Sequence, residues 1–304
     1  MKLYAPKYYE NFVCIADKCK HSCCIGWEID VDENALSKYT KLCGGYGDVV
    51  KNSISNTPSP HFNLCENDRC PHLNEKGLCN IILNLGEDCL CDICREHPRF
   101  YNYTNYGKEV GIGISCEEAA RIVLTSDCYS QIIEIGKADG QPEQTDFDAV
   151  LMREEIFAIL SNTTLPYSEK LALIHEKYNV NTNINTDAEW QRILSNLEYL
   201  DENHRSLFSS YSSNMRTPPE IEKYAERLLA YFIFRHTSEA YDIKDFCISL
   251  GFCMFCERLF VSVCKAENAT ALDQIIEIAR IISEEIEYSE DNTEKTKNEF
   301  YKFF

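Results

Sequence analysis

Cysteine is the residue whose number and spacing suggest chemistry in this sequence. Seventeen cysteines occur among 304 residues, and 13 of them lie between Cys14 and Cys128. The segment CKHSCCIGW, which begins at Cys19, places three thiols within six residues. Four chemical uses compete for such a group: disulfides, a structural metal, a redox or catalytic metal, and nucleophilic thiols.

The cellular compartment decides whether disulfides are a plausible use of these cysteines. The N-terminal stretch MKLYAPKYYENFVC lacks the apolar core of a signal peptide. The most apolar later run, FCISLGFCMFCERLFVSVC, contains Glu257 and Arg258, so it predicts a buried helix and no membrane span. We therefore expect a cytoplasmic protein with no membrane partner. Because cytosolic thiols are kept reduced and the number of cysteines is odd, metal ligation is favoured over disulfides.

The spacing of the thiols suits two kinds of metal centre. They form three groups: Cys14, Cys19, Cys23 and Cys24; Cys65, Cys70 and Cys79; and Cys89, Cys91, Cys94 and Cys116. Zinc sites use pairs of closely spaced cysteines, as in Cys19-x3-Cys23 and Cys91-x2-Cys94. The adjacent thiols of Cys23 and Cys24 fit one zinc ion poorly, and iron–sulfur clusters also take four cysteines. Spacing alone leaves both metals open.

Other chemistries leave no signature in the sequence. There is no G-x-G-x-x-G, phosphate-binding lysine loop, Gly-x-Ser-x-Gly or His-Glu-x-x-His motif. The Cys-x3-Cys-x2-Cys pattern of radical enzymes is broken by Gly26. The formal charge of −19 argues against a nucleic-acid partner and favours basic partners.

The elements that position these residues differ between the two parts of the chain. The first part is rich in turn-forming residues, whereas apolar residues follow helical spacing in the second. We predict a mainly α protein, with an irregular cysteine-rich metal-binding domain at 1–135, containing short helices, and an all-helical domain at 136–304. Helices are expected near 32–42, 116–126, 187–201, 218–237, 242–266 and 270–288, after a cap at Asp146 or Asp148, and after Pro166. Cys253 and Cys256 are expected to pack in the core, and Glu284, Glu285 and Glu287 to be solvated.

The whole arrangement resembles the flagellin lysine N-methylase family. The matching segments are YYENFVCIADKCKHSCCIGWEIDVDE (8–33), CPHLNEKGLC (70–79), LGEDCLCDICREHPR (85–99) and SCEEAAR (115–121), with a weaker one, ISEEIEYSEDN, at 282–292. His97 departs from the aromatic residue expected before Pro98. The resemblance implies these metal ligands: Cys14, Cys19, Cys23, Cys24, Cys70, Cys79, Cys94 and Cys116.

The resemblance also implies an activity, which is methyl transfer from S-adenosylmethionine to lysines of flagellin by an enzyme with an iron–sulfur cluster. A 4Fe-4S cluster is then favoured, with zinc as the alternative. Candidate substrate-side groups are Glu87, Asp88, Tyr101 and Tyr103, because carboxylates attract a cationic lysine and aromatic faces can hold a cation. Alternatively, these residues cap a turn and pack. The competing function is a non-catalytic redox or interaction protein that binds zinc or an iron–sulfur cluster.

Overall fold

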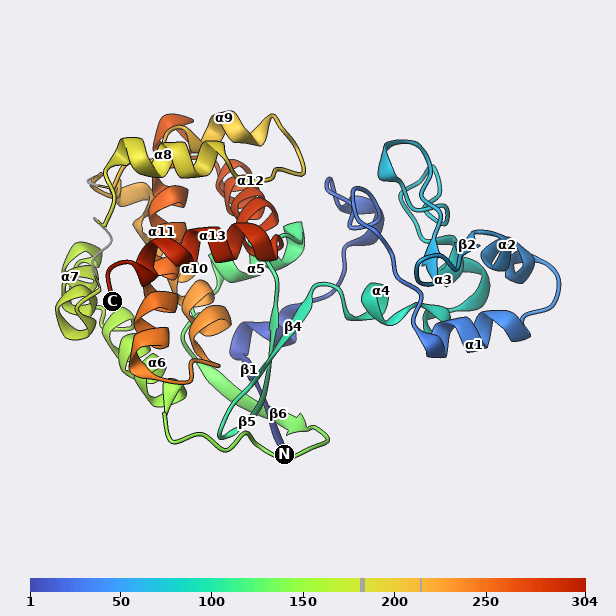
Figure 1. The fold of residues 1–304 in the computed structure, drawn as a ribbon, viewed down its shortest axis with the longest axis horizontal. Helices are drawn as coiled ribbons and strands as arrows, with labels where there is room; N and C mark the ends of the chain where they lie inside the picture. Colours follow the sequence, from blue (N-terminus) through green and yellow to red (C-terminus); the bar gives the residue numbers. More distant parts are fainter. Residues whose placement is uncertain (181–183, 214) are drawn as a thin grey trace. The chain divides into compact units, whose positions relative to one another are not determined.

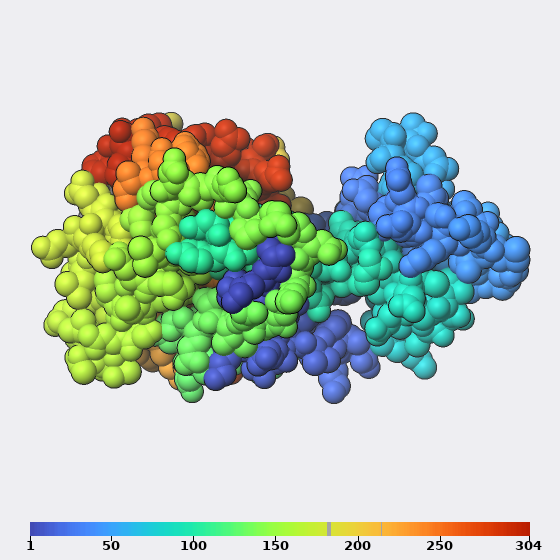
Figure 2. Space-filling view, turned by 90° about the horizontal axis from the view of Figure 1, so that it is seen from below, coloured from blue at the N-terminus to red at the C-terminus, as the bar shows by residue number. Residues whose placement is uncertain are grey.

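The computed structural model describes residues 1–180, 184–213 and 215–304. The chain forms two compact units, each considered separately below. Unit 1 comprises Met1–Phe12 and Tyr101–Phe304, and unit 2 comprises Val13–Phe100. Figure 1 shows the course of the chain, and in Figure 2 the dark blue N-terminal residues lie among green residues of the same unit.

A four-stranded sheet organises one side of unit 1. Its strands are β1 (Lys2–Pro6), β4 (Arg99–Tyr103), β5 (Gly107–Ile112) and β6 (Ile132–Lys137), in the order β4-β5-β1-β6. β1 runs parallel to β5 and antiparallel to β6. The first residues of the chain therefore complete a sheet whose other strands lie about a hundred or more residues later.

Helices make up most of unit 1. They are η1 (Lys7–Asn11), α5 (Glu117–Thr125), α6 (Ala149–Leu160), α7 (Tyr167–Tyr178), α8 (Asp187–Ser195), α9 (His204–Phe208), α10 (Pro219–Thr237), α11 (Ile243–Ala266), α12 (Leu272–Ile282), the π-helix η5 (Ser283–Glu287) and α13 (Glu290–Tyr301). α11 packs against α10, α12 and α13, and Figure 1 shows it in the middle of the helices. By length and composition α11 could span a membrane, but 94% of its apolar window is buried inside the protein. Cys253 and Cys256 lie within it with no exposed surface, as predicted.

Unit 2 is built from short elements around a small apolar core. They are η2 (Ala16–Lys18), α1 (Glu33–Lys41), α2 (Tyr46–Asn52), β2 (Ile54–Ser55), β3 (His61–Phe62), η3 (Glu66–Asp68), α3 (Asn80–Leu85), η4 (Glu87–Cys89) and α4 (Asp92–Glu96). The core includes Tyr39, Val50 and Phe62, together with Cys70 and Cys91. Asp32 caps α1 by accepting a hydrogen bond from the Ala35 amide.

The structure confirms a mainly α fold and changes two other expectations. The sheet of unit 1 was not predicted, because its strands are short and pair across large sequence separations. The division of the chain also differs from the predicted boundary between 135 and 136. The unit that carries most of the cysteines ends at Phe100, because β1 pairs with both β5 and β6 and all three strands belong to the helical unit.

Candidate metal centre and buried carboxylate network

Six cysteine side chains of unit 2 lie in or against its core. Cys70 and Cys91 are buried, with 6% and 1% of their surface exposed. Cys24, Cys79, Cys89 and Cys94 pack half-buried against the same core. Cys24 acts electrostatically on Cys70, Cys79 and Cys94, and Cys91 acts on Cys79, so three separate segments meet here. We call the five cysteines that these contacts connect the thiol cluster: Cys24, Cys70, Cys79, Cys91 and Cys94.

Backbone pairing joins the first two segments of the thiol cluster. The Cys70 amide donates a hydrogen bond to the Cys24 carbonyl at 2.8 Å. Cys79 is bridged in antiparallel fashion to Leu73, three residues after Cys70. Because these bonds involve the main chain, the approach of these thiols is set by the backbone and does not depend on side-chain rotamers alone.

The third segment brings Cys91 and Cys94 to the same place. Cys91 is the N-cap residue of the short helix α4, and its thiol is hydrogen-bonded to that of Cys94. The Tyr39 hydroxyl lies 3.4 Å from the Cys91 sulfur and donates to the Cys89 carbonyl at 2.6 Å. Tyr39 is fully buried, so it fixes this loop against the core.

Two of these thiols ionise more readily than usual and three less readily. Burial raises the pKa of Cys79, and the hydrogen bond to Cys91 raises the pKa of Cys94. The hydrogen bond from Cys23 lowers the pKa of Cys24 to about 7, and that from Cys94 lowers the pKa of Cys91. Burial raises the pKa of Cys70 to about 12, so this thiol ionises only with a compensating cation. Thiolates are the metal-binding form of cysteine, and a donor set of five soft sulfurs fits zinc or an iron–sulfur cluster.

The predicted ligands divide between the thiol cluster and other places. Cys24, Cys70, Cys79 and Cys94 belong to the thiol cluster. The cluster also contains Cys91, which is not among the ligands that the family resemblance implies, although the Cys91-x2-Cys94 spacing suits zinc.

The remaining predicted ligands lie elsewhere in the two units. The thiols of Cys14 and Cys19 each form a hydrogen bond with a backbone atom two residues further along the chain. Cys23 is exposed at the edge of the thiol cluster, where its side chain is hydrogen-bonded to that of Cys24, and Cys116 is the N-cap residue of α5 in unit 1. The role of these four as ligands stays a prediction.

The predicted substrate-side residues lie in both units. Glu87 and Asp88 form the short turn η4 of unit 2, where the Lys38 ammonium donates to the Asp88 carbonyl at 2.6 Å. Tyr101 lies on β4, and the Lys108 ammonium is 3.8 Å from the centroid of its ring. Tyr101 thus holds a cation on its face, whereas the joint catalytic role of Glu87, Asp88 and Tyr101 stays a prediction.

Two open clefts adjoin the thiol-bearing segments of unit 2. One of about 330 Å³ is lined by residues of α1 and of the loop around Cys91, including Asp32, Lys38 and Arg95. The other, of about 420 Å³, includes Trp27 and Phe62. Both present polar groups next to the metal-binding candidates.

The π-helix η5 turns two glutamates into the interior of unit 1. The Tyr288 amide donates to the Ser283 carbonyl at 3.1 Å, which is the i→i+5 bond of a π turn. Glu285 is 1% exposed and Glu287 is 7% exposed. The expectation that these two residues are solvated was therefore wrong, because the wider turn rotates them away from the solvent-facing side.

Glu287 lies at the centre of a largely buried polar network. Its carboxylate accepts hydrogen bonds from Ser283 Oγ at 2.6 Å and Tyr231 Oη at 3.1 Å, and lies 2.6 Å from His236 Nε2. Arg235 Nε is 3.5 Å away. Burial opposes ionisation of Glu287, yet Arg235 and His236 leave its pKa below the usual value. Burial lowers the pKa of His236 to about 4, so this imidazole is neutral.

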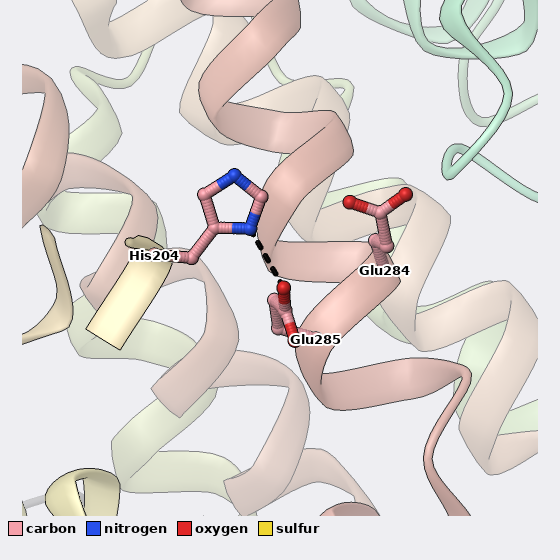
Figure 3. A group of neighbouring side chains, drawn as sticks. All are labelled: His204, Glu284 and Glu285. Carbon is pink, nitrogen blue, oxygen red and sulfur yellow. Dashed lines mark hydrogen bonds and ion pairs between the residues drawn. The ribbon is translucent and has the colours of Figure 1, made fainter. Parts of the chain in front are cut away.

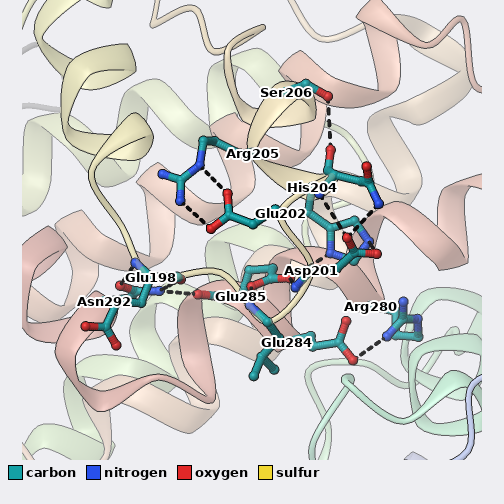
Figure 4. A network of polar contacts seen from close by, with 12 residues as sticks. Glu198, Asp201, Glu202, His204, Arg205, Ser206, Arg280, Glu284, Glu285 and Asn292 are labelled. Carbon is teal, nitrogen blue, oxygen red and sulfur yellow. Dashed lines mark hydrogen bonds and ion pairs between the residues drawn. The ribbon is translucent and has the colours of Figure 1, made fainter. Parts of the chain in front are cut away.

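Glu285 fastens the segment before α9 to η5. Its carboxylate accepts from the amides of Leu200 and Asp201, and lies 2.7 Å from His204 Nδ1. Figure 3 shows that contact with Glu284 beside it, and donor atoms of His204, Glu284 and Glu285 lie within 4.8 Å of one another. Figure 4 shows the wider network, in which the Glu284 carboxylate is paired with an arginine. His204, Glu284 and Glu285 are therefore paired within unit 1, and they join the segment before α9 to η5.

Comparisons with known proteins place part of the chain near lysine methylases. It is 24% identical over 135 residues to "Lysine-N-methylase" of Salmonella choleraesuis (strain SC-B67), a match that covers 39% of this chain and 31% of that protein. The lysine-N-methylase of Salmonella typhimurium matches over the same shares at 24% identity. "Flagellar biosynthetic protein FliU" of Salmonella muenchen is 26% identical over 128 residues, covering 39% of this chain and 75% of that protein. No family model and no solved structure matches the chain.

Proposed function

We propose that this chain is a protein-lysine N-methyltransferase that acts on flagellin with S-adenosylmethionine and carries an iron–sulfur cluster. The observation that carries the proposal is the partial similarity to proteins named lysine-N-methylase, together with the flagellar name of a third relative. The chain matches about a third of the length of the lysine-N-methylases, so the activity and the substrate of this chain are proposals.

The thiol cluster supports the cluster-binding part of the proposal. Four thiolates complete a 4Fe-4S centre, and Cys24, Cys70, Cys79, Cys91 and Cys94 offer five sulfurs at a largely buried place. Zinc is the alternative occupant, because it also takes four thiolates. A bound cluster would supply a rigid, redox-capable anchor that ties the three cysteine-bearing segments together.

Methyl transfer to lysine makes limited demands on the protein. The methyl group passes from the sulfonium to the neutral amine, the carbon–sulfur bond breaks, and the lysine proton leaves to a base or to water. The free amine has a pKa near 10.4, so the protein has to desolvate the ammonium or accept its proton. It also has to align the amine with the methyl group. The cleft of about 330 Å³ next to the thiol cluster, which carries both carboxylates and cations, provides polar surface for such alignment.

Mass spectrometry of flagellin after incubation with S-adenosylmethionine tests the activity. We expect lysine-containing peptides to gain mass in steps of one methyl group, and only when protein and cosubstrate are both present. If flagellin gains no mass while the purified protein retains its metal, the methyltransferase proposal is wrong. The non-catalytic metal-binding function then replaces it.

Anaerobic purification tests the metal centre independently of activity. We expect a brown protein with stoichiometric iron and sulfide, and a colourless protein containing zinc would exclude the iron–sulfur cluster. Cys91→Ser is expected to lower the metal content strongly, because it removes a buried sulfur of the thiol cluster. The matched control is Cys43→Ser, which changes an exposed thiol of the same unit and should leave the metal content unchanged.

A further inference from the structure

The outer face of the β4–β5 hairpin presents aromatic rings to solvent. Tyr101 and Tyr103 are 36% and 41% exposed, whereas Asn102 between them is 4% exposed and donates to the Phe234 carbonyl. This alternation follows from the two-residue period of a strand. Two tyrosine side chains therefore stand next to each other on the edge strand of the sheet.

A lysine of the same chain already rests on these rings. The Lys108 ammonium is 3.8 Å from the centroid of Tyr101 and 5.2 Å from that of Tyr103. Aromatic faces attract cations through their quadrupole, and a contact at an exposed site contributes about 0.5–1 kcal/mol. The tyrosine pair is thus shaped to receive an alkylammonium group.

Lys108 differs from two other lysines that contact tyrosine rings, and Lys223 over Tyr224 resembles it in having no ion pair among the described residues. Lys2 and Lys177 also have carboxylate partners, Glu134 at 2.7 Å and Glu155 at 2.9 Å. Among the described residues, by contrast, Lys108 forms no ion pair. Its ammonium is held by the rings without an opposite charge, so a second ammonium can displace it without breaking a salt bridge.

The edge of the hairpin carries negative charge that favours a cation. The Glu239 carboxylate accepts a hydrogen bond from the Tyr103 amide at 2.6 Å. Glu143, which is exposed, acts electrostatically on Glu239 and bonds the neighbouring Thr104 carbonyl through its own amide. An incoming lysine would therefore meet aromatic faces bordered by acidic groups, the combination that suits an ammonium.

We propose that Tyr101 and Tyr103 form the face that receives the ammonium group of a substrate lysine, and that Lys108 is an internal placeholder which this lysine displaces. The proposal rests on the methyltransferase function for the identity of the substrate. The alternative is an ordinary cross-strand contact, in which Lys108 only covers the rings.

Binding of flagellin-derived peptides to the full-length protein distinguishes a lysine-binding face from an ordinary cross-strand contact. The peptides carry lysine, trimethyl-lysine or uncharged norleucine at one position. Lys108→Met keeps the length of the side chain and removes the competing charge. We expect it to tighten binding of the lysine and trimethyl-lysine peptides about two- to fivefold, the equivalent of one exposed cation–π contact. Norleucine binding should stay the same.

Matched variants identify the rings as the receptor. Tyr101→Phe keeps the aromatic face and should retain binding, whereas Tyr101→Leu should lose the preference for the charged peptides. The trimethyl-lysine N-methyl proton signal should shift upfield by ring current on binding, and this shift should vanish with Tyr101→Leu. Lys223→Met is the control, since its ammonium lies 4.7 Å over Tyr224 on α10, away from the sheet.

Two outcomes would overturn the proposal. One is unchanged affinity in Lys108→Met, and the other is equal tightening for the lysine and norleucine peptides. Thermal unfolding of each variant shows whether a loss reflects misfolding. Methyl transfer by the unaltered protein is measured in parallel. If the unaltered protein methylates flagellin but Lys108→Met does not change peptide binding, only the placeholder role of Lys108 is refuted. If the peptides bind as expected but no methyl group is transferred, only the proposed methyltransferase function is refuted.

Discussion

Replacing Glu287 by glutamine should destabilise unit 1 strongly. The substitution keeps the shape of the side chain and removes the charge that balances Arg235, whose Nε is 3.5 Å away. It also places an amide N–H₂ where two donors, from Ser283 and Tyr231, now point at one carboxylate oxygen. Breaking a buried ion pair by removing one partner typically costs about 3–5 kcal/mol.

The size of this effect follows from the burial of the network. The side chain of Glu287 has no exposed surface, so water cannot reach this position to solvate Arg235 once the carboxylate charge is lost. A loss of about 3–5 kcal/mol corresponds to a fall in melting temperature of roughly 6–20 °C for a domain of this size. Urea unfolding followed by circular dichroism measures the change in the free energy of unfolding. Helices dominate unit 1, so the signal reports on this unit.

A control and a double mutant sharpen this test. Glu294→Gln removes an exposed carboxylate from α13 and should change stability by less than about 0.5 kcal/mol. Glu287→Leu combined with Arg235→Met should cost less than the two single substitutions added together, because no buried charge is left unpaired. Two results would contradict this effect. One is a free energy of unfolding for Glu287→Gln within about 1 kcal/mol of that of the unaltered protein, and the other is a double mutant, Glu287→Leu with Arg235→Met, whose cost equals the sum of the two single costs.

Three further results are expected from local structure. Charge and hydrogen bonding from Glu285 outweigh burial and raise the pKa of His204 above 6.5, so its stabilising contribution should be complete below pH 6.5 and lost as the pH rises through the folded-state pKa. Urea unfolding at several pH values should show this loss, and His204→Gln should abolish it. Gly251→Ala should cost about 1–3 kcal/mol, because the new methyl group would lie 2.5 Å from the buried Phe300 ring; a neutral or stabilising result in thermal unfolding would contradict this packing. Asp148→Ala should lower unfolding free energy by about 0.5–2 kcal/mol by removing the cap of α6, whereas Asp148→Asn should largely preserve it.

Local sequence signals predicted several long helices of unit 1, missed α13, and did not predict the sheet. Of the two caps offered for α6, Asp148 is the one used, and the apolar run around Cys253 forms the buried helix α11. These features depend on residues a few positions apart. β1 is only five residues long, and its partners lie about a hundred or more residues away. Its pairing depends on the tertiary fold, which no local pattern contains.

The sequence predicted that cysteines would gather in this part of the chain, but it did not predict which of them pack together. The excess of cysteines and their grouping indicated a thiolate-bound metal, and four of the predicted ligands do meet at the core of unit 2. Spacing alone does not show that Cys91 packs in the core and Cys23 at the surface, because this depends on which thiol faces the core. Tyr39 contacts the Cys91 sulfur and fixes it there, whereas Cys23 is exposed.

The buried glutamates show where residue type misleads. Glutamate is almost never fully buried unless it is paired, so solvated helix residues were expected at these positions. The i→i+5 bond between Tyr288 and Ser283 inserts one extra residue into the turn, so the faces of the helix are reassigned from that point. Glu285 and Glu287 then face inward, where His204 and His236 meet them. Because a π turn forms only where tertiary contacts reward it, the partners far along the chain determine the local geometry.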